Sequence, residues 1–199
     1  MKKVRTIKAL TKASIRAAAR KAAKELRAGG LIIFPTETVY GIGADPHNPE
    51  AVRSLFKAKK RPLSKPFQLL VGNLQQAKKA AKKITKEAAA LMASDWPGPL
   101  TIVVEKKKQV PDIMTSGLKT VGLRLPDHPV ALEIIKAFKG PIAASSANLS
   151  GKKPPTTARQ AVLQIKDKAS LIIDSGTAAK GVPSRIVDAT GKKLKVLRK

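Results

Sequence analysis

The regular alternation of short apolar segments with segments of helical periodicity limits most strongly what this chain can fold into. Apolar runs of strand length occupy residues 31–34, 67–71, 101–105, 121–125, 141–147, 171–176, 184–189 and 193–198. Helical spacing of apolar residues marks the segments between them at 11–28, 48–60, 74–96, 127–138 and 158–166. Because alternating strands and helices are typical of layered α/β folds, we expect one α/β domain with a twisted, mixed sheet flanked by helices.

Two of the expected helices carry a recognisable N-terminal signal. Asn48 precedes Pro49 and Glu50, which is the order of an N-cap, a first helical position and an acidic first turn. Asp127 is the expected N-cap of the helix over 127–138, and His128 beside it is expected to have a structural role.

The length and composition limit the number of domains and the compartment. A chain of 199 residues can bury one full-sized core and is short for two, so we expect residues 1–199 to form a single domain. Cysteine is absent, which excludes disulfides and thiolate metal sites and fits a reducing compartment. No apolar run approaches the roughly 20 residues of a membrane helix. No continuous apolar segment follows the positively charged N-terminus. We therefore expect a cytoplasmic protein that is neither exported nor embedded in a membrane.

The charge balance favours a polyanionic partner. The 40 Lys and Arg residues outnumber the 13 Asp and Glu residues, giving a formal net charge of +27 that attracts RNA, DNA and nucleotides. A solvated, lysine-rich surface explains the same number equally well. Aromatic residues are only 3% of the chain, so a nucleic acid would be held through its phosphates and not by stacked bases. Basic residues cluster on the first helix and near residue 80 (Lys12, Arg16, Arg20, Lys24 and Arg27; Lys78, Lys79, Lys82 and Lys83).

Several common catalytic and nucleotide-binding motifs do not occur in this sequence. It has neither a G-x-x-x-x-G-K-[ST] loop nor a full G-x-G-x-x-G after a strand. Two histidines and no cysteine make a zinc site improbable, so we expect no metal site built by the protein. No G-x-S-x-G nucleophile motif is present.

Polar and basic residues instead interrupt the apolar segments where strands and helices end. Hydroxyl, amide and carboxylate groups follow two strands, and a basic cluster closes a helix (Thr36, Glu37 and Thr38; Ser145, Ser146 and Asn148; Lys59, Lys60 and Arg61). In open α/β sheets, ligands bind in the crevice at strand ends, and Lys and Arg there suit phosphate. Each group taken alone also fits a turn, a cap or a helix-dipole partner. Three such interruptions together favour a binding site for a polar, phosphorylated ligand.

Six segments in a fixed order resemble the YrdC/Sua5 family, the threonylcarbamoyl-AMP synthases. They are PTETVYGIG (35–43), KKRP (59–62), WPGPLT (96–101), VGLRLPDHP (121–129), SSANLSG (145–151) and PSRIVD (183–188). The similarity extends from about residue 15 to the C-terminus, and the length resembles the short, single-domain bacterial form. The resemblance implies a YrdC-like fold with a basic concave face.

The resemblance also implies a reaction. L-threonine, bicarbonate or CO2, and ATP would give threonylcarbamoyl-adenylate and pyrophosphate. Mg²⁺ would accompany ATP as a substrate complex. Threonylcarbamoyl-transferase proteins would then carry the group to position 37 of tRNAs that read codons beginning with A. The tRNA would bind the basic surface.

By the same resemblance, the catalytic residues are Lys59, Arg61, Ser146 and Asn148. The residues implied for ATP are Arg61, Lys65, Thr120, Ser146 and Arg198. Those implied for threonine are Thr36, Arg124, Ala144 (through its backbone) and Ser184. Two positions depart from the family pattern: Lys60 stands where a glycine is common, and Leu70 stands where many longer members carry a histidine.

Two other functions remain open at this point. One is a non-catalytic RNA-binding or ribosome-associated protein on the same scaffold, driven by the +27 charge. The other is a carbamoyl-transfer domain like that of hydrogenase maturation proteins, against which the length and the absence of cysteine argue. The intact pairs Lys59-x-Arg61 and Ser146-x-Asn148 favour the enzyme over both.

Overall fold

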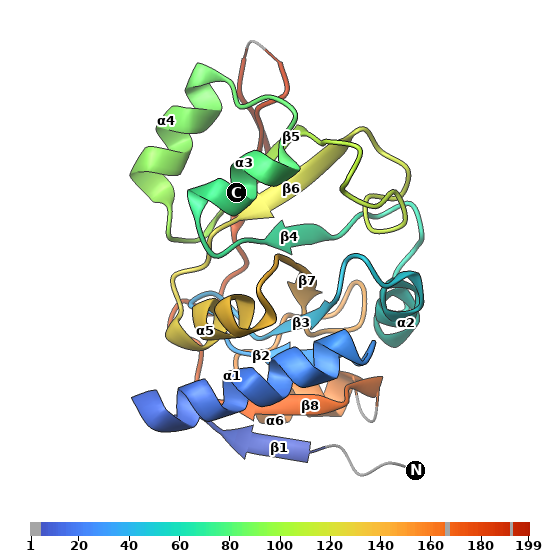
Figure 1. Ribbon diagram of the computed structural model, residues 1–199, viewed down its shortest axis with the longest axis vertical. Helices are drawn as coiled ribbons and strands as arrows, with labels where there is room; N and C mark the ends of the chain where they lie inside the picture. The colour runs from blue at the N-terminus through green and yellow to red at the C-terminus, as the bar shows by residue number, and fades with distance from the viewer. Residues whose placement is uncertain (1–4, 166–167, 192) are drawn as a thin grey trace.

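Ten strands of the chain form a single mixed sheet in the computed structural model, which describes residues 5–165, 168–191 and 193–199 (Figure 1). The strands are β1 (Arg5–Lys8), β2 (Ile32–Phe34), β3 (Gly41–Ala44), β4 (Gln68–Leu70), β5 (Leu100–Glu105), β6 (Thr120–Arg124), β7 (Ile142–Ser146), β8 (Leu171–Asp174), β9 (Arg185–Asp188) and β10 (Lys195–Arg198). Their order in the sheet is β1-β8-β2-β3-β7-β4-β6-β5-β9-β10. Parallel and antiparallel pairs occur side by side, which confirms the predicted mixed α/β sheet.

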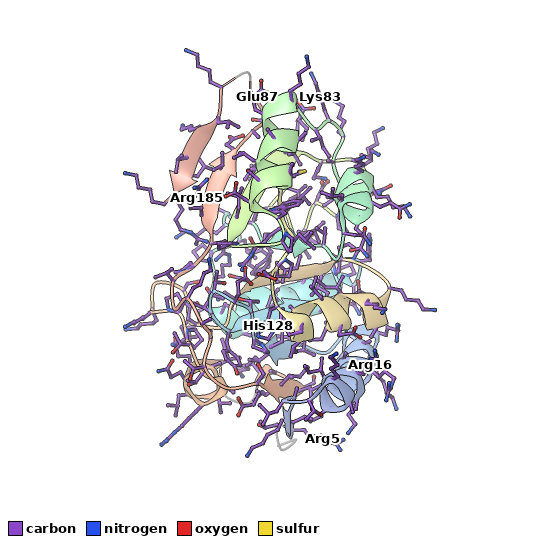
Figure 2. All side chains as sticks on the ribbon, turned by 90° about the vertical axis from the view of Figure 1, so that its left-hand side faces the viewer. Arg5, Arg16, Lys83, Glu87, His128 and Arg185 are labelled. Atoms are coloured by element: carbon purple, nitrogen blue, oxygen red, sulfur yellow. The ribbon has the colours of Figure 1, made fainter. Side chains whose placement is uncertain are left out.

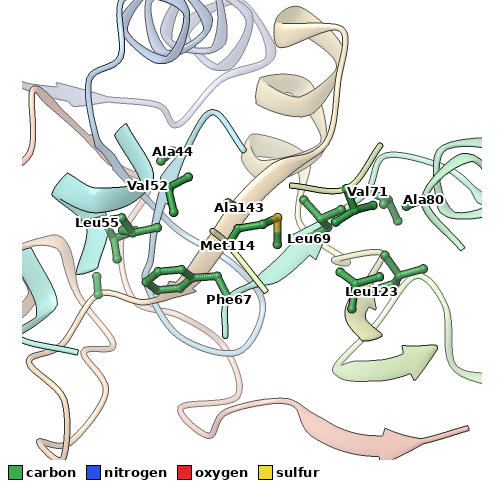
Figure 3. Packing of buried hydrophobic residues seen from close by; sticks show 14 of the residues in the cluster. Ala44, Val52, Leu55, Phe67, Leu69, Val71, Ala80, Met114, Leu123 and Ala143 are labelled. Atoms are coloured by element: carbon green, nitrogen blue, oxygen red, sulfur yellow. The ribbon is translucent and has the colours of Figure 1, made fainter. Parts of the chain in front are cut away.

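Among the described residues, six α-helices flank this sheet: α1 (Lys12–Arg27), α2 (Pro49–Lys59), α3 (Leu74–Ala80), α4 (Lys86–Asp95), α5 (Pro129–Phe138) and α6 (Ala158–Ile165). Helices α1 and α5 lie together over β2 and β3, and their apolar stripes meet strands β2, β7 and β8 in one buried cluster. The larger cluster joins α2, α4 and α6 to β4, β5 and β6; Figure 3 shows Leu55, Phe67, Leu69 and Leu123 within it. Residue 166, placed in the last helix by the sequence pattern, lies outside the described residues.

The helix ends confirm one predicted cap and correct the other. Asn48 accepts a hydrogen bond from the backbone N–H of Ala51 and is the N-cap of α2, as predicted. The prediction of Asp127 as the cap of α5 is wrong. The cap is His128, whose Nδ1 accepts the N–H of Val130 at 3.2 Å. Pro129 then occupies the first turn, so the helix begins one residue later than the acidic side chain suggested.

The segment 74–96 forms two helices, although its pattern predicts mostly one. Ala81 pairs with Lys106 in an isolated bridge, and the N–H of Lys82 donates to the carbonyl of Glu105 at 2.7 Å. These long-range hydrogen bonds end the first helix. Thr85 is the N-cap of the second helix, α4, and its hydroxyl accepts a hydrogen bond from the backbone N–H of Ala88. Strands β1 and β3 are also absent from the sequence-based prediction, because neither has a long apolar run.

The basic residues are spread over the molecule. Figure 2 places Arg5 and Arg16 at one end of the chain's long axis and Lys83 at the other. The basic concave face therefore stays a prediction. Within the described ranges, no helix has both the length and the apolar content needed to cross a bilayer.

Candidate active site

A cavity of about 680 Å³ lies against strands β4 to β7, β9 and β10 and the end of α2. Pairing of β7 with β3 and β4 holds Ala144 and Ser146 in its wall, while β6 contributes Thr120 and Arg124. Ten of the eleven residues implied by the resemblance line this cavity (Lys59, Arg61, Lys65, Thr120, Arg124, Ala144, Ser146, Asn148, Ser184 and Arg198). The structure thus brings together residues that are up to 139 positions apart in the sequence, from Lys59 to Arg198.

Arg124 is fixed at the inner wall by a buried ion pair. Its Nη2 donates to Oε1 of Glu37 at 2.7 Å and to Oγ1 of Thr38 at 2.9 Å, and its Nε donates to the carbonyl of Gly98 at 3.3 Å. The Arg124 and Glu37 side chains are 5% and 8% exposed. Within the described part of the chain, Oε2 of Glu37 is buried without a hydrogen-bond partner. A buried pair of this kind holds the guanidinium in one orientation, ready to meet an anionic ligand group.

Thr36 is the one implied residue that does not reach the cavity wall. It is buried, and its hydroxyl donates to the carbonyl of Val39 at 2.6 Å and lies 2.8 Å from Oγ1 of Thr38. Thr38, two residues later, lines the cavity instead and contacts Arg124. The two hydroxyls are therefore hydrogen-bonded neighbours, and the one of Thr38 is also bonded to the guanidinium of Arg124. The contact of Thr36 with threonine stays a prediction.

Lys59 lies at the C-terminal end of α2 with only 1% exposure. Its Nζ donates to the carbonyls of Ser146 and Asn148, the latter at 2.6 Å, and its own carbonyl accepts the N–H of Ser150 at 2.9 Å. Burial, and secondarily the charge of Arg61, lowers the pKa of Lys59 to about 7. A neutral amine still has two N–H groups for these two carbonyls, so both protonation states can hold the loop after β7.

Two further guanidiniums line the cavity beyond Arg124. Arg61 donates from Nε to the carbonyl of Lys65 and from Nη2 to that of Pro66, and it lies 5.1 Å from the ring centre of Phe67. Arg198 donates from Nε to the carbonyl of Ser184 at 2.9 Å. Burial lowers the pKa of both, and each is lowered further by a neighbouring cation, Arg61 by Arg198 and Arg198 by Arg124. The positive charges of these neighbouring guanidinium groups are therefore not fully balanced by negative groups.

Hydroxyl and amide groups complete the wall, and several of them were missed by sequence reasoning. Thr101 lies 2.9 Å from Oγ of Ser184 and donates to Oε1 of Gln68 at 2.7 Å. Both Thr101 and Gln68 interrupt apolar strand segments, which is the signal that singled out Ser146. Within the described residues, Oδ1 of Asn148 and Oγ of Ser150 are buried without a partner and belong to the same wall. A polar ligand would satisfy such atoms.

The charged side chains of the wall are Lys59, Arg61, Lys65, Arg124, Arg198 and one carboxylate, Asp188. Guanidinium groups bind carboxylate and phosphate in two-pronged geometry, and the hydroxyls suit a small polar ligand. No group of three or more potential metal ligands occurs among the described residues. His128 lies outside the cavity, and burial lowers the pKa of its imidazole.

A family model for Sua5, YciO and YrdC, described as "Telomere recombination", matches residues 24–199. A protein of Pyrococcus abyssi named threonylcarbamoyl-AMP synthase is 44% identical over 169 residues, which are 85% of this chain and 50% of that protein. The synthase so named from Photobacterium profundum is 34% identical, over 82% of this chain and 90% of that protein. The structure of P. abyssi Sua5 complexed with L-threonine matches with a TM-score of 0.92 and 39% identity, over 98% of this chain and 57% of that one. This chain spans about half the length of the first curated relatives it matches.

Proposed function

Because this chain belongs to the Sua5/YciO/YrdC family, we propose that it is a threonylcarbamoyl-AMP synthase, a nucleotidyltransferase that consumes L-threonine, bicarbonate or CO2, and ATP. We propose further that residues 1–199 act as one YrdC-like domain. Two relatives that are named for this activity support the proposal, because this chain covers 90% and 95% of their own length.

The observation that carries the proposal is a single cavity with two kinds of anion site. Arg124 and Thr38 form an inner region where a guanidinium adjoins a hydroxyl, which suits the carboxylate and hydroxyl of an amino acid. Ser184, the other hydroxyl proposed for threonine, is hydrogen-bonded to Arg198. Arg61 and Arg198 form a second region whose cations have no acidic partner among the described residues, which suits a triphosphate. An L-threonine complex of a relative at 39% identity supports the first assignment by similarity.

The proposed chemistry needs alignment and charge stabilisation and no covalent intermediate on the protein. Threonine's neutral amine adds to CO2 and loses a proton to water to give a carbamate, and a carbamate oxygen attacks the α-phosphorus of ATP. The bond from that phosphorus to the bridging oxygen breaks in line, and pyrophosphate leaves with the electron pair. Arg61 and Arg198 would stabilise the charge that builds on the phosphates. Ser146, Asn148 and Thr120 would orient polar ligand groups, and Lys65 would meet phosphate at the rim. Ala144 would contribute backbone polar groups.

The cavity wall fits a Mg²⁺ ion that enters with ATP better than one held by the protein. Asp188 is the one carboxylate in the wall, and its Oδ1 already accepts from the N–H and the hydroxyl of Thr190. Mg²⁺ commonly uses one or two carboxylates together with substrate phosphates. The ion would therefore be coordinated chiefly by the phosphates, where it neutralises charge.

We also propose that the product serves tRNA modification in the cytoplasm, where ATP and tRNA are available. Threonylcarbamoyl-transferase proteins would consume the adenylate, and the tRNA would approach through the basic surface. The net charge of +27 also fits the second candidate function, that of a non-catalytic RNA-binding protein. Buried, unpartnered polar atoms in the cavity favour a site that binds a small ligand over a purely electrostatic surface.

The experiment that tests the activity is a substrate-omission series. The protein is incubated with ATP, bicarbonate and isotopically labelled L-threonine, and pyrophosphate and the labelled adenylate are measured. We expect release of pyrophosphate only when all three are present. Serine should support it less well, since one methyl group is worth about 1–3 kcal/mol of discrimination. Pyrophosphate release that is equal without threonine would refute the synthase, and RNA binding without any turnover would favour the second candidate.

A further inference from the structure

A second cavity of about 760 Å³ lies beside the first, between the end of α2 and the loop before β6. Its wall contains apolar side chains of Phe56, Leu63 and Ile113, and its cations include Lys57 and Lys60. Arg61 belongs to the walls of both cavities. Nothing in the proposed reaction uses this second space.

The charges of the second cavity are unbalanced in favour of an anion. Its one acidic residue, Asp112, accepts a hydrogen bond from Nζ of Lys106 at 2.7 Å. Its Arg53 is paired with Glu50. The side chains of Lys57, Lys60 and Arg61 have no acidic partner among the salt bridges of the described residues. Cations above an apolar wall suit a ligand with an anionic end and an apolar body.

Ser116 gives a second, independent sign of a ligand. Its Oγ is buried and lacks a hydrogen-bond partner within the described chain, a feature it shares with Asn148 and Ser150 in the wall of the first cavity. Its backbone φ of 55° is in the left-handed region. This φ closes the turn over residues 112–117, where the N–H of Gly117 donates to the carbonyl of Asp112, as the N–H of Arg61 donates to the carbonyl of Phe56 around Lys60. The sign of a ligand is therefore the unsatisfied hydroxyl, because buried polar atoms normally have a hydrogen-bond partner.

The loop that carries Ser116 is held in this conformation by hydrogen bonds within the protein. The N–H groups of Thr115 and Gly117 both donate to the carbonyl of Asp112, at 3.1 Å and 2.9 Å. Nζ of Lys106, whose side chain is 8% exposed, also donates to the carbonyl of Val110 at 2.7 Å. The wall is therefore formed in advance of any ligand, which lowers the entropy cost of binding.

We propose that this second cavity binds a nucleoside phosphate, with the base against Phe56, Leu63 and Ile113 and the phosphate on Lys57 and Lys60. A base supplies a flat, largely apolar body, and its polar edge offers the hydrogen bond that Ser116 lacks. A fatty acid would fill the apolar space but leave that hydroxyl unpaired. The source of the nucleotide is either a free nucleoside phosphate or one nucleotide of an RNA. The site does not depend on the synthase activity, although a shared Arg61 would couple the two cavities energetically.

The test uses the intact, isotope-labelled protein and its backbone amide signals. AMP, inorganic phosphate and a single-stranded hexa-adenylate RNA are each titrated while the amides of Leu63, Ile113 and Gly117 are followed. We expect AMP to shift these signals and phosphate alone to bind more weakly. Leu63→Glu should lower the AMP affinity measured there by about tenfold or more, because it replaces an apolar contact of the base by a carboxylate and adds negative charge to a site that binds an anion. Leu163→Glu is the matched control, because Leu163 on α6 is 68% exposed, against 72% for Leu63, and lies in neither cavity.

Each outcome decides the proposal or the source of the ligand. If the RNA shifts the same amide signals more strongly than AMP does, and Leu63→Glu lowers the affinity for the RNA, the nucleotide belongs to an RNA. If AMP alone binds there, the ligand is a free nucleotide. The proposal is overturned if only amides of the first cavity respond, if phosphate binds as tightly as AMP, or if Leu63→Glu and Leu163→Glu behave alike. Because both leucines are exposed, the two variants are expected to melt like the wild type.

Discussion

At the scale of single residues, burial changes what a cation can do. Lys59 and Arg61 are two positions apart, yet Lys59 is 1% exposed and bonded to two carbonyls, whereas Arg61 lies at the junction of both cavities. Direct contact of Lys59 with phosphate stays a prediction, and its hydrogen bonds indicate a role in holding the loop that carries Ser146 and Asn148.

The lowered pKa of Lys59 leads to a prediction about protons. With a pKa of about 7 in the free protein, the amine is largely neutral at pH 8. A bound triphosphate favours the charged form, so ATP binding at pH 8 should take up nearly one proton. At pH 6 the amine is already charged and the uptake should vanish. Calorimetric titrations in two buffers of different ionisation enthalpy measure this number. Equal uptake by wild type and Lys59→Met at pH 8 would contradict the assignment to Lys59.

Arg61 should contribute to turnover far more than to stability. Arg61→Ala removes a guanidinium from the proposed phosphate region, and loss of one such donor typically costs about 10²–10³ in kcat. Arg61→Lys keeps the charge but cannot bond two carbonyls in the same way, so we expect only partial recovery. Arg16→Ala, on the exposed face of α1, is the control. Adenylate formation and a melting curve are measured on each; near-normal rates in Arg61→Ala would show that the site is misplaced.

Thr38 and Thr36 should separate a ligand contact from a structural one. Thr38→Val removes a hydroxyl that lines the cavity and accepts from Arg124, so it should raise the apparent KM for threonine with little change for ATP. Thr36→Val breaks a buried bond to the carbonyl of Val39 and should cost about 1 kcal/mol of stability. Separate titrations of threonine and ATP, with urea unfolding, test this pair. A larger effect on the KM for threonine from Thr36→Val than from Thr38→Val would support Thr36 as the threonine contact.

At the scale of elements, the junction after α2 positions much of the site. The helix ends at Lys59, and Lys60 adopts a left-handed conformation with φ of 47° that redirects the chain toward Arg61. The glycine that the family resemblance implies at this position has a plain physical reason, since left-handed backbone disfavours a Cβ. Lysine here keeps the geometry at a cost in strain.

Replacing Lys60 by glycine should therefore stabilise the protein. Relief of the left-handed strain outweighs the added entropy of glycine by up to about 1 kcal/mol. A change of that size raises Tm by roughly 2–4 °C in a chain of this length. Lys57→Gly, one turn earlier in the same helix, should instead lower it, because glycine disfavours a helix interior. Thermal unfolding of both variants checks the sign, and a fall in Tm for Lys60→Gly would contradict the account.

At the scale of the whole molecule, the excess of positive charge is distributed and not confined to the cavities. Arg5 and Arg16 lie toward one end of the molecule and Lys83 at the other (Figure 2), and the five ion pairs among the described residues use few of the 40 cations. A surface of this kind attracts a polyanion over a wide area.

Binding of tRNA should accordingly depend steeply on salt. If six or more phosphates are contacted, affinity should fall by about 10³ or more between 50 and 200 mM salt. A filter-binding or fluorescence titration at several salt concentrations gives the slope. The double variant Arg16→Glu/Arg20→Glu should reduce the slope if α1 belongs to the contact surface. An affinity that does not change with salt would show that the lysines only solvate the surface.

The sequence by itself determined the α/β class, the order of most elements and the family, because these depend on local periodicity and on short motifs in a fixed order. It also indicated the strand ends where Ser146 and Asn148 lie. The tertiary structure decided which groups reach the ligand. The turn before β3 buries both Thr36 and Thr38 and places Thr38 against Arg124 in the cavity wall, and the pairing of β7 with β3 and β4 places the carbonyls that bind Lys59. Orientation and burial arise from contacts between residues far apart in the chain, and no local pattern encodes them.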